Sequence, residues 1–351
     1  MVLERLFPED WLERKFIYAF ILGVSYSVLG IIIARLLFTS NSGIVSVFFT
    51  SIFLSPSMRK IFSIEELSEK RAKKFSMKKL YQLDYDVILM YFLIFLGIFA
   101  SYLAFSFLLP QFGIDSFHLL KEQLFLDQSL RGRATDQFHS ILSITYNNWW
   151  VLLATFVLGL IAGDGAIFFV AWNASAWGTI FGARVLQASI YSGQNSWYLL
   201  FGLLIVVIWH VILEGGAYLL VGISGSTISQ EIVKEKIEVK EFLIWIVISF
   251  FLFYLINFLI RDYSIYIKFI IYLALTFAML HYLGKIVAEK KNRQVYTFNL
   301  AVFMIALLVF ILGVVVEVYV LSNSSILHNI YSMSSCYSSK IPFEICSKAL
   351  V

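Results

Sequence analysis

The chain has 351 residues, of which 60% are hydrophobic and 14% are charged, and its formal net charge is +4. A soluble globular domain contains about 45 to 50% apolar and about 25% charged residues, so this composition excludes that class. One helical span takes about 20 residues, which leaves no room for a separate soluble domain. The sequence predicts an all-α polytopic transmembrane helical bundle of about eight to nine spans.

Apolar segments long enough to enter a bilayer follow one another along most of the chain. The first comes after the charged stretch ERLFPEDWLERK and has no small-residue cleavage site, so we expect a retained helix and not a signal peptide. The second is short for a span. In chain order, the predicted spans are residues 16–38, 43–57, 87–109, 149–170, 197–221, 242–260, 263–284 and 298–321.

Basic residues indicate which loops face the cytoplasm. Residues 58–80 contain eight Lys and Arg against three Glu, and a second basic cluster lies at residues 285–293. These two anchors place the N-terminus in the cytoplasm and residues 110–148 outside. We therefore expect a multi-pass protein of the plasma membrane.

The loop QEIVKEKIEVKE lies two predicted spans before the second basic cluster, so it is on the same, cytoplasmic side. An odd number of crossings therefore has to separate it from the outer segment 110–148. Only two predicted spans lie between them. The missing crossing has to come from residues 173–190, NASAWGTIFGARVLQASI, which are rich in small residues. We expect a short inserted or re-entrant helix there, packed inside the protein. The total becomes nine crossings, with the C-terminus outside.

The domain organisation follows from this topology. Residues 1–321 are predicted to form one transmembrane domain with a Gly-rich core at 149–226 and an extra helix pair at 242–284. Residues 322–351 are predicted to form an extracytoplasmic, Ser-containing tail. That tail holds the only two cysteines, Cys336 and Cys346. On the oxidising side of the membrane we expect a disulfide between them, with two free thiols as the alternative.

Glycine is concentrated in the middle third of the chain, where 11 of the 19 glycines lie. Two GxxxG spacings, GLIAG and GTIFG, occur there, and such spacings let helices approach closely where lipid offers no hydrophobic driving force. The glycines expected to pack helices together are Gly159, Gly163, Gly178, Gly182, Gly222 and Gly225.

Polar residues in the same region form a candidate intramembrane polar core: His210, Glu214, Asn173, Asp164 and Arg184. A charged side chain at the bilayer centre costs about 2.5 to 3.5 kcal/mol even on the lenient insertion scale, so such residues face the protein interior. His210 and Glu214 are four residues apart and share a helix face, where each can pair with the other or with a neighbouring helix. The pair either locks helices together or serves a function. Asp164, between glycines in AGDGA, is expected in an aqueous turn.

Enzyme motifs are missing from the chain: HExxH, GxSxG and Walker A are all absent. His210 and Glu214 supply two of the three protein ligands that a catalytic zinc requires. The stretch EELSEKR resembles the EExxxR element of CAAX-type intramembrane proteases, but it is one residue too long and lies in the basic loop. We therefore expect a non-enzymatic protein with no catalytic residues, no metal and no cofactor.

Two segments, NNWWVLLATFVLGLIAGDGAIFFVAWNASAWGTIFGAR and WHVILEGGAYLLVGISGSTIS, resemble the stage II sporulation protein M family, in particular its archaeal-type integral membrane branch. PEDWLERKFIYAFILGVSYSVLG and LGVVVEVYV, which contains Glu317, also resemble that branch. Val211 stands where the family has glycine, and residues 231–296 carry two extra spans. The matching positions are Asn173, Gly178, His210, Glu214, Ala217, Tyr218, Gly222 and Gly225.

The resemblance implies a non-enzymatic membrane scaffold or a remodelling and assembly component, because the family member in spore-forming bacteria helps to organise peptidoglycan hydrolases. The alternative is a transporter or channel that uses the His210/Glu214 site, since broken helices beside intramembrane ionisable groups typify transporter sites. An intramembrane hydrolase ranks third. The expected partners are the lipid bilayer and other membrane proteins or a second copy of the chain, and not nucleic acid.

The predicted topology can be tested with single cysteines placed in a variant that lacks Cys336 and Cys346. In intact cells, a membrane-impermeant maleimide should label a cysteine in residues 110–148 and leave one in residues 70–79 unlabelled. Permeabilised cells should label both positions, which controls for burial. The reverse pattern in intact cells would contradict the charge-based orientation.

Overall fold

The computed structural model describes residues 16–38, 40–71, 76–113, 137–234, 239–260, 262–288 and 293–339, and this part of the chain is helical without a strand. The helices are α2 (Ile17–Leu37), α3 (Ser42–Arg71), α4 (Met77–Leu108), η2 (Leu109–Phe112), α7 (Gln137–Ala162), α8 (Ala166–Ser192), α9 (Ser196–Lys234), α10 (Val239–Leu259), α11 (Ile265–Ala288), α12 (Arg293–Asn323) and α13 (Ser325–Ser338).

Seven helices of the described part are long and apolar enough to cross a membrane: α2, α4, α7, α8, α9, α11 and α12. The predicted all-α polytopic bundle is therefore confirmed. The apolar part of α10, Ile244–Leu259, is shorter. The second predicted span, 43–57, begins α3, but this helix contains Pro56 and continues into the basic segment. Its apolar part is too short to count among the seven.

The prediction of a short helix at 173–190 is wrong in length, because these residues belong to α8, a helix of 27 residues. The predicted packing inside the protein is confirmed, since 72% of this span is buried. The chain breaks earlier than predicted, at Gly163, whose φ of 64° ends α7. The sequence pattern placed the break late because residues 166–170 are as apolar as the helix before them. Three helices, α7, α8 and α9, still lie between the two loops, so the odd number of crossings is preserved.

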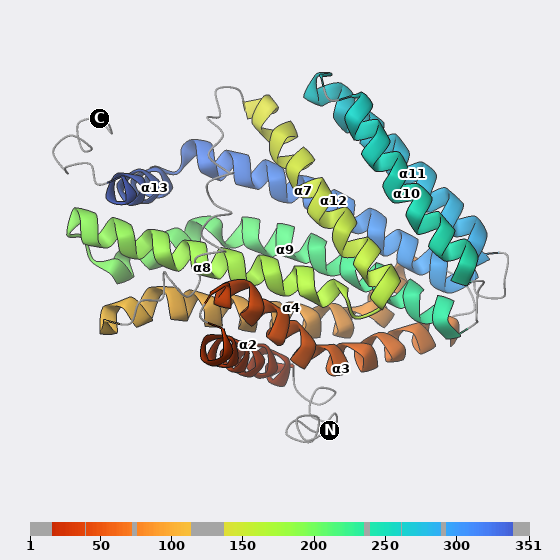
Figure 1. Cartoon of the computed structure of the whole chain (residues 1–351), viewed down its shortest axis with the longest axis horizontal. Coiled ribbons are helices and arrows are strands. Elements are labelled where there is room, and N and C mark those ends of the chain that lie inside the picture. The colour runs from red at the N-terminus through yellow and green to blue at the C-terminus, as the bar shows by residue number, and fades with distance from the viewer. Residues whose placement is uncertain are drawn as a thin grey trace.

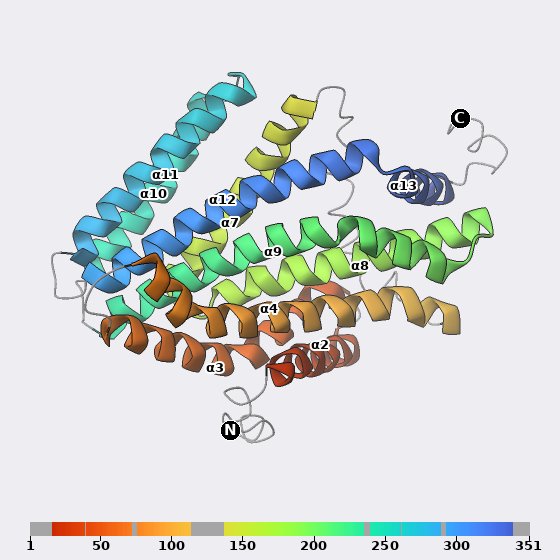
Figure 2. The same ribbon diagram turned by 180° about the vertical axis from the view of Figure 1, so that it is seen from behind.

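The helices pack around α9, which contacts α12, α7 and α8 along much of its length. Figures 1 and 2 show α8 and α9 between α4 and α12, with α2 and α3 beyond α4 and the α10–α11 pair beside α12. Two hydrophobic cores result. One joins α2, α3, α4, α8 and α13 to α9, and the other joins α7, α10, α11 and α12 to the same helix. Trp177 packs against both cores, so α9 and Trp177 lie at the seam between them.

Glycines make the closest of these contacts possible. A Cβ on Gly178 would lie 2.5 Å from the Phe99 carbonyl oxygen of α4, and one on Gly225 would lie 2.5 Å from the Phe156 carbonyl oxygen of α7. Gly182 and Gly159 likewise face backbone atoms of neighbouring helices, whereas the neighbours of Gly222 are side chains. Gly163 differs from the other predicted packing glycines because it lies in the turn after α7.

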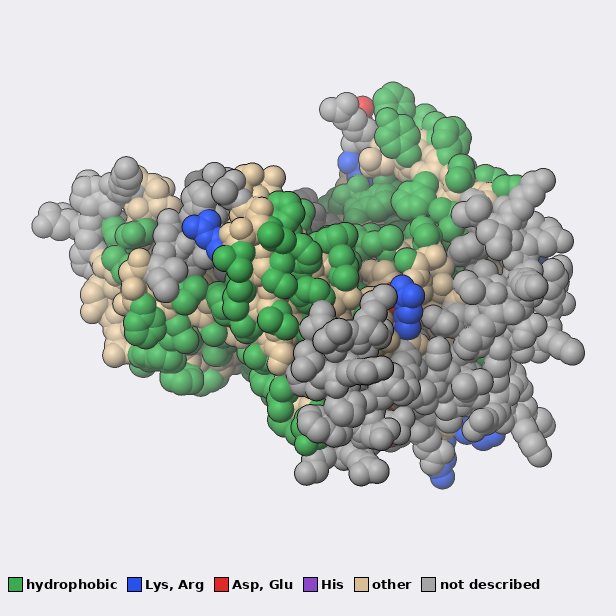
Figure 3. All heavy atoms as spheres, turned by 60° about the horizontal axis from the view of Figure 1, so that its bottom comes forward, with side chains coloured by type: hydrophobic (Ala, Val, Ile, Leu, Met, Phe, Trp, Pro, Cys, Tyr) green, Lys and Arg blue, Asp and Glu red, His purple; other side chains and the backbone are tan. Residues whose placement is uncertain are grey.

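The exterior of the bundle is apolar. Figure 3 shows hydrophobic side chains over most of the described surface on that face, with Lys and Arg side chains scattered singly among them. Large exposed side chains include Ile205 on α9, Phe258 on α10 and Leu308 on α12. Apolar side chains on the outside and polar ones within suit a lipid environment, and the chain is accordingly a multi-pass membrane protein.

The first half of the predicted tail is a helix that packs on the bundle. Ser324 caps α13 by accepting a hydrogen bond from the Leu327 backbone N–H at 3.2 Å. Leu327, Ile330 and Ser334 are buried against the bundle, chiefly on α8. Cys336 lies on α13, and Cys346 lies outside the described residues, so their disulfide stays a prediction.

The glycine contacts predict a difference between two Gly→Ala variants. Gly178→Ala should lower stability by about 1 to 3 kcal/mol, because the new methyl group overlaps the α4 backbone. Gly216→Ala is the matched control: it is also helical, but a Cβ there meets nothing within 4 Å. That variant should be neutral or stabilising by up to about 1 kcal/mol. Thermal melts in detergent measure both effects, and equal melting temperatures would contradict the packing described.

Candidate functional site

His210 and Glu214 lie on one face of α9, as their spacing predicts. His210 is 8% exposed and Glu214 is 2% exposed. The His210 Nδ1 atom lies 3.2 Å from Glu214 Oε2. The two side chains therefore pair with each other inside the bundle.

A third ionisable side chain, Glu317 of α12, joins this pair. Gly313 lies one turn before Glu317, and a Cβ on Gly313 would be 3.1 Å from the Glu214 backbone nitrogen, so the two helix backbones approach closely here. Glu317 Oε2 lies 3.9 Å from His210 Nδ1, and its side chain is 18% exposed. One donor atom from each of the three residues lies within 4.8 Å of the others.

Two polar side chains hold the other oxygen of Glu214. Asn148 of α7 donates a hydrogen bond from Nδ2 to Glu214 Oε1. The Tyr218 hydroxyl, one turn along α9, donates to the same oxygen at 2.7 Å. Because Oε1 is held from this side, Oε2 is turned toward the His210 imidazole. Trp177 of α8 packs beside that imidazole, with ring centroids 5.4 Å apart.

The charge of this cluster is its main physical feature. Two ionised carboxylates within 4.8 Å of each other would repel by about 3 kcal/mol or more at an effective dielectric constant of 20. Asn148 and Tyr218 are hydrogen-bond donors without a formal charge, so they do not cancel a second negative charge. Within the described residues, His210 Nδ1 and Glu317 Oε2 make no hydrogen bond. The site is thus arranged to take up positive charge, as protons or as a cation.

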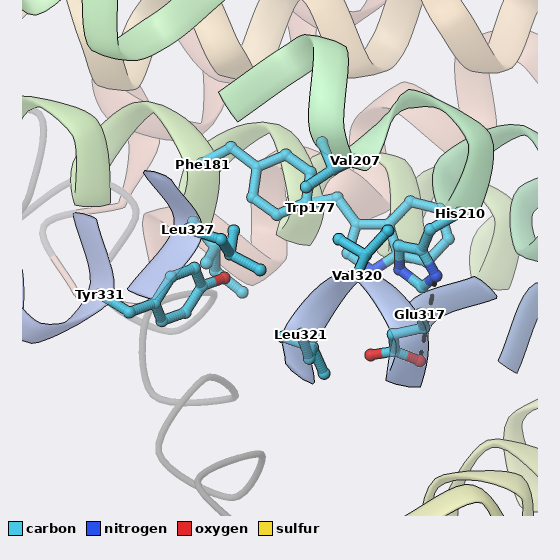
Figure 4. A pocket seen from close by; sticks show the side chains of 10 residues that line it. Trp177, Phe181, Val207, His210, Glu317, Val320, Leu321, Leu327 and Tyr331 are labelled. Atoms are coloured by element: carbon cyan, nitrogen blue, oxygen red, sulfur yellow. Dashed lines mark ion pairs between the residues drawn. The ribbon is translucent and has the colours of Figure 1, made fainter. Parts of the chain in front are cut away.

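A cavity of about 70 Å³ reaches the site from the α13 end of the bundle. His210 and Glu317 line it at one end, and Leu327 and Tyr331 of α13 line it at the other (Figure 4). Trp177 and Phe181 of α8 lie along its side. A cavity of this size has room for a few water molecules, and His210 and Glu317 offer them polar partners.

Arg184 lies outside this cluster and attaches α13 to the bundle. Its Nη1 donates a hydrogen bond to Ser334 Oγ at 2.7 Å, and Ser334 in turn donates to Gln187 Oε1 at 2.9 Å. The guanidinium also lies 5.6 Å from the centroid of the Tyr331 ring, within the range of cation–π attraction. Arg184 thereby positions the helix that covers the cavity.

Asp164 and Asn173 also lie away from the His210 site. Asp164 occupies the turn between α7 and α8, as expected, but it is 6% exposed and therefore not in water. Arg59 Nε contacts Asp164 Oδ2 at 2.9 Å, and the Ser55 hydroxyl donates to the same oxygen. Asn173 donates to the Phe169 carbonyl of its own helix at 2.8 Å. The five predicted polar residues thus lie at four separate places and do not form one core.

Sequence reasoning missed the partners that other helices supply. Glu317 is the one acidic residue of α12. An ionisable residue within an apolar helix is the same signal that marks Glu214, but the sequence prediction uses Glu317 only in the family resemblance. Asn148 is uncharged and stands at the edge of an apolar run, so nothing in its spacing marked it. The prediction that no metal binds was based on two possible ligands, His210 and Glu214. The structure places a third possible ligand, Glu317, beside them.

The fold and the site define the class: a polytopic helical membrane protein with a buried imidazole and two carboxylates beside an accessible cavity. A scan against protein-family models found no match for this chain, and neither did searches of curated proteins and of solved structures.

The contacts of Arg184 predict how α13 is held. Arg184→Met keeps the apolar stem but removes the hydrogen bond to Ser334 and the cation–π contact, at a cost of about 1 to 3 kcal/mol. Backbone amides of residues 325–338 should then exchange with deuterium faster, while α4 and α9 keep their protection. Arg35→Met, at an exposed arginine of α2, is the control. Unchanged exchange in α13 would contradict the anchoring role.

Proposed function

We propose that this membrane protein is a transporter or channel for a small cation, protons included, and that His210, Glu214 and Glu317 form its central site. The cavity carries the proposal, because it brings space for water to a buried charged cluster. A pair that only locks two helices together requires close packing on all sides and gains nothing from such a space.

The charge of the site supports a cation as the substrate. Its two carboxylates repel each other unless a positive charge is shared between them, and His210 Nδ1 and Glu317 Oε2 have no hydrogen-bond donor within the described residues. A cation or proton bound here lowers the free energy of the site, and its release restores the repulsion. Binding that is favourable yet reversible is what conduction requires.

The depth of the site also supports the proposal. His210 lies about 21 Å along α9 from Ser196, at a rise of 1.5 Å per residue. The hydrocarbon core of a bilayer is about 30 Å thick, so a membrane boundary near Ser196, where the apolar span of α9 begins, would put the site well inside it. Transporter sites characteristically lie near the membrane midplane, beside breaks between helices.

Polar and small residues continue beyond the site on the same face of α9. Tyr218, Gly222 and Ser226 follow Glu214 at intervals of four residues, and all three are buried. The Tyr91 hydroxyl of α4 would lie 3.7 Å from a Cβ on Gly222. The Ser226 hydroxyl makes no hydrogen bond to the described residues. Small and polar residues thus occupy this buried face of α9 from Glu214 as far as Ser226.

A membrane scaffold or assembly component of the stage II sporulation protein M type is the second candidate. The residues that resemble that family support it, and so do the glycine contacts, which suit a rigid platform. Both candidates make the protein non-enzymatic, with the plasma membrane as its location. In both, the loop charges favour a cytoplasmic N-terminus and an outer α13.

The two candidates differ in what Glu214→Gln does. In proteoliposomes with an imposed membrane potential, wild-type protein should change the signal of an internal proton- or cation-sensitive dye. Glu214→Gln keeps a similar shape but cannot ionise, so it should abolish this flux and leave the melting temperature unchanged. Glu214→Leu should instead lower stability by about 1 to 3 kcal/mol, because the Asn148 and Tyr218 donors lose their acceptor.

Asp262→Asn, at an exposed acid between α10 and α11, is the matched control and should conduct like wild type. Wild-type protein that moves neither protons nor metal or alkali cations would favour the scaffold. Equal flux through wild type and Glu214→Gln would remove this site from the pathway.

A further inference from the structure

We propose that His210, Glu214 and Glu317 bind a divalent first-row transition-metal ion of the Mn²⁺ or Zn²⁺ class. This inference rests on the proposed function and names the class of cation that occupies its site. The three residues come from two helices and meet where α9 and α12 approach each other at Gly313.

The donor atoms of His210 and Glu214 have the spacing of a coordination shell, and that of Glu317 lies close by. Ligand atoms bound at about 2.0 to 2.2 Å from a metal, at tetrahedral or octahedral angles, lie roughly 3 to 3.6 Å from each other. His210 Nδ1 and Glu214 Oε2 are 3.2 Å apart, which falls within this range. Glu317 Oε2 is 3.9 Å from His210 Nδ1, and the three donor atoms lie within 4.8 Å of one another, so Glu317 has to move toward the pair by about 1 Å to complete the shell.

The atoms that face the centre of the cluster are free to coordinate. Within the described residues, His210 Nδ1 and Glu317 Oε2 have no hydrogen-bond partner, although His210 is only 8% exposed. A buried nitrogen and oxygen without partners are costly unless something else occupies their lone pairs. A metal ion between them satisfies both.

Groups around the cluster support its ligands in the way that metal sites require. Glu214 Oε1 accepts hydrogen bonds from Asn148 and Tyr218, which orient the carboxylate and leave Oε2 for the ion. Outer groups that orient a ligand in this way are typical of metal sites.

The donor set selects the class of ion. Carboxylate oxygens suit Mg²⁺, Ca²⁺ and Mn²⁺, whereas imidazole suits Zn²⁺, Fe²⁺, Ni²⁺ and Cu²⁺. One imidazole with two carboxylates therefore favours borderline ions over Mg²⁺ and Ca²⁺, which prefer all-oxygen shells. A divalent charge also balances the two glutamates. The cavity beside Glu317 provides space for water to complete the coordination shell (Figure 4).

Metal binding can be measured on full-length protein in detergent, purified through a tag without histidine and stripped with a chelator. Titration with MnCl₂, ZnCl₂, MgCl₂ or CaCl₂ should show one site that prefers Mn²⁺ or Zn²⁺. Glu317→Gln should weaken this binding by more than about 100-fold, and Tyr218→Phe, which removes only a supporting hydrogen bond, by about 10- to 100-fold. His281→Gln and Asp164→Asn, which lie outside the cluster, should bind like wild type.

A spectroscopic measurement keeps the test decisive if a variant fails to fold. Pulsed electron paramagnetic resonance of Mn²⁺ bound to wild-type protein should show coupling to a ¹⁴N nucleus of an imidazole. When histidine is labelled with ¹⁵N, a ¹⁵N coupling should replace the ¹⁴N coupling. Absence of that coupling overturns the proposed ligand set. So does equal affinity for Mg²⁺ and Mn²⁺, or binding that Glu317→Gln leaves unchanged.

The two proposals fail in different ways. Proton or alkali-cation flux that depends on Glu214, without any binding of Mn²⁺ or Zn²⁺, overturns the metal site and leaves the proposed transport function in place. Specific metal binding without flux of any cation leaves the metal site in place and overturns transport.

Discussion

The burial of two carboxylates and an imidazole in an apolar bundle is the constraint on which the rest of this structure depends. A charged or polar side chain facing lipid is costly, so α9 has to be covered by protein on its polar face. Three other helices, α7, α8 and α12, supply that cover. Asn148 of α7 and Tyr218 of α9 donate to Glu214, Trp177 of α8 packs beside His210, and α12 brings Glu317. Their positions are linked because each contacts the same pair.

Close helix approach makes this cover possible. Gly313 lets the α12 backbone come near Glu214, and without it Glu317 would be held farther from His210. Gly178 and Gly225 bring α8 to α4 and α9 to α7 in the same way. Because α9 contributes to both hydrophobic cores, the site lies at the seam between them.

Transporter and scaffold share most of their physical requirements, since both need a rigid, well-packed bundle. What separates them is the environment of the polar cluster. Glu214 is fully supported by hydrogen bonds on one side, as in a structural pair, but on the other side His210 and Glu317 line a cavity. A carboxylate that is held firmly on one side and faces, on the other, an imidazole that lines a cavity differs from a pair that is closely packed on all sides. Arg184 adds to this asymmetry by holding α13 over the open side.

The sequence alone determined the membrane class, most of the helices and the shared face of His210 and Glu214, because hydropathy and helical spacing are local properties. The charged loops on opposite sides of the membrane also required a third helix between residues 148 and 231. The predicted start of that helix was too late, because apolar residues continue through 166–170. Only the tertiary structure decided which polar residues meet. Asp164 pairs with Arg59, Arg184 with Ser334, and Glu317 with His210 at sequence separations of about 100 residues or more. Such pairings depend on how helices pack in three dimensions, which no local pattern specifies.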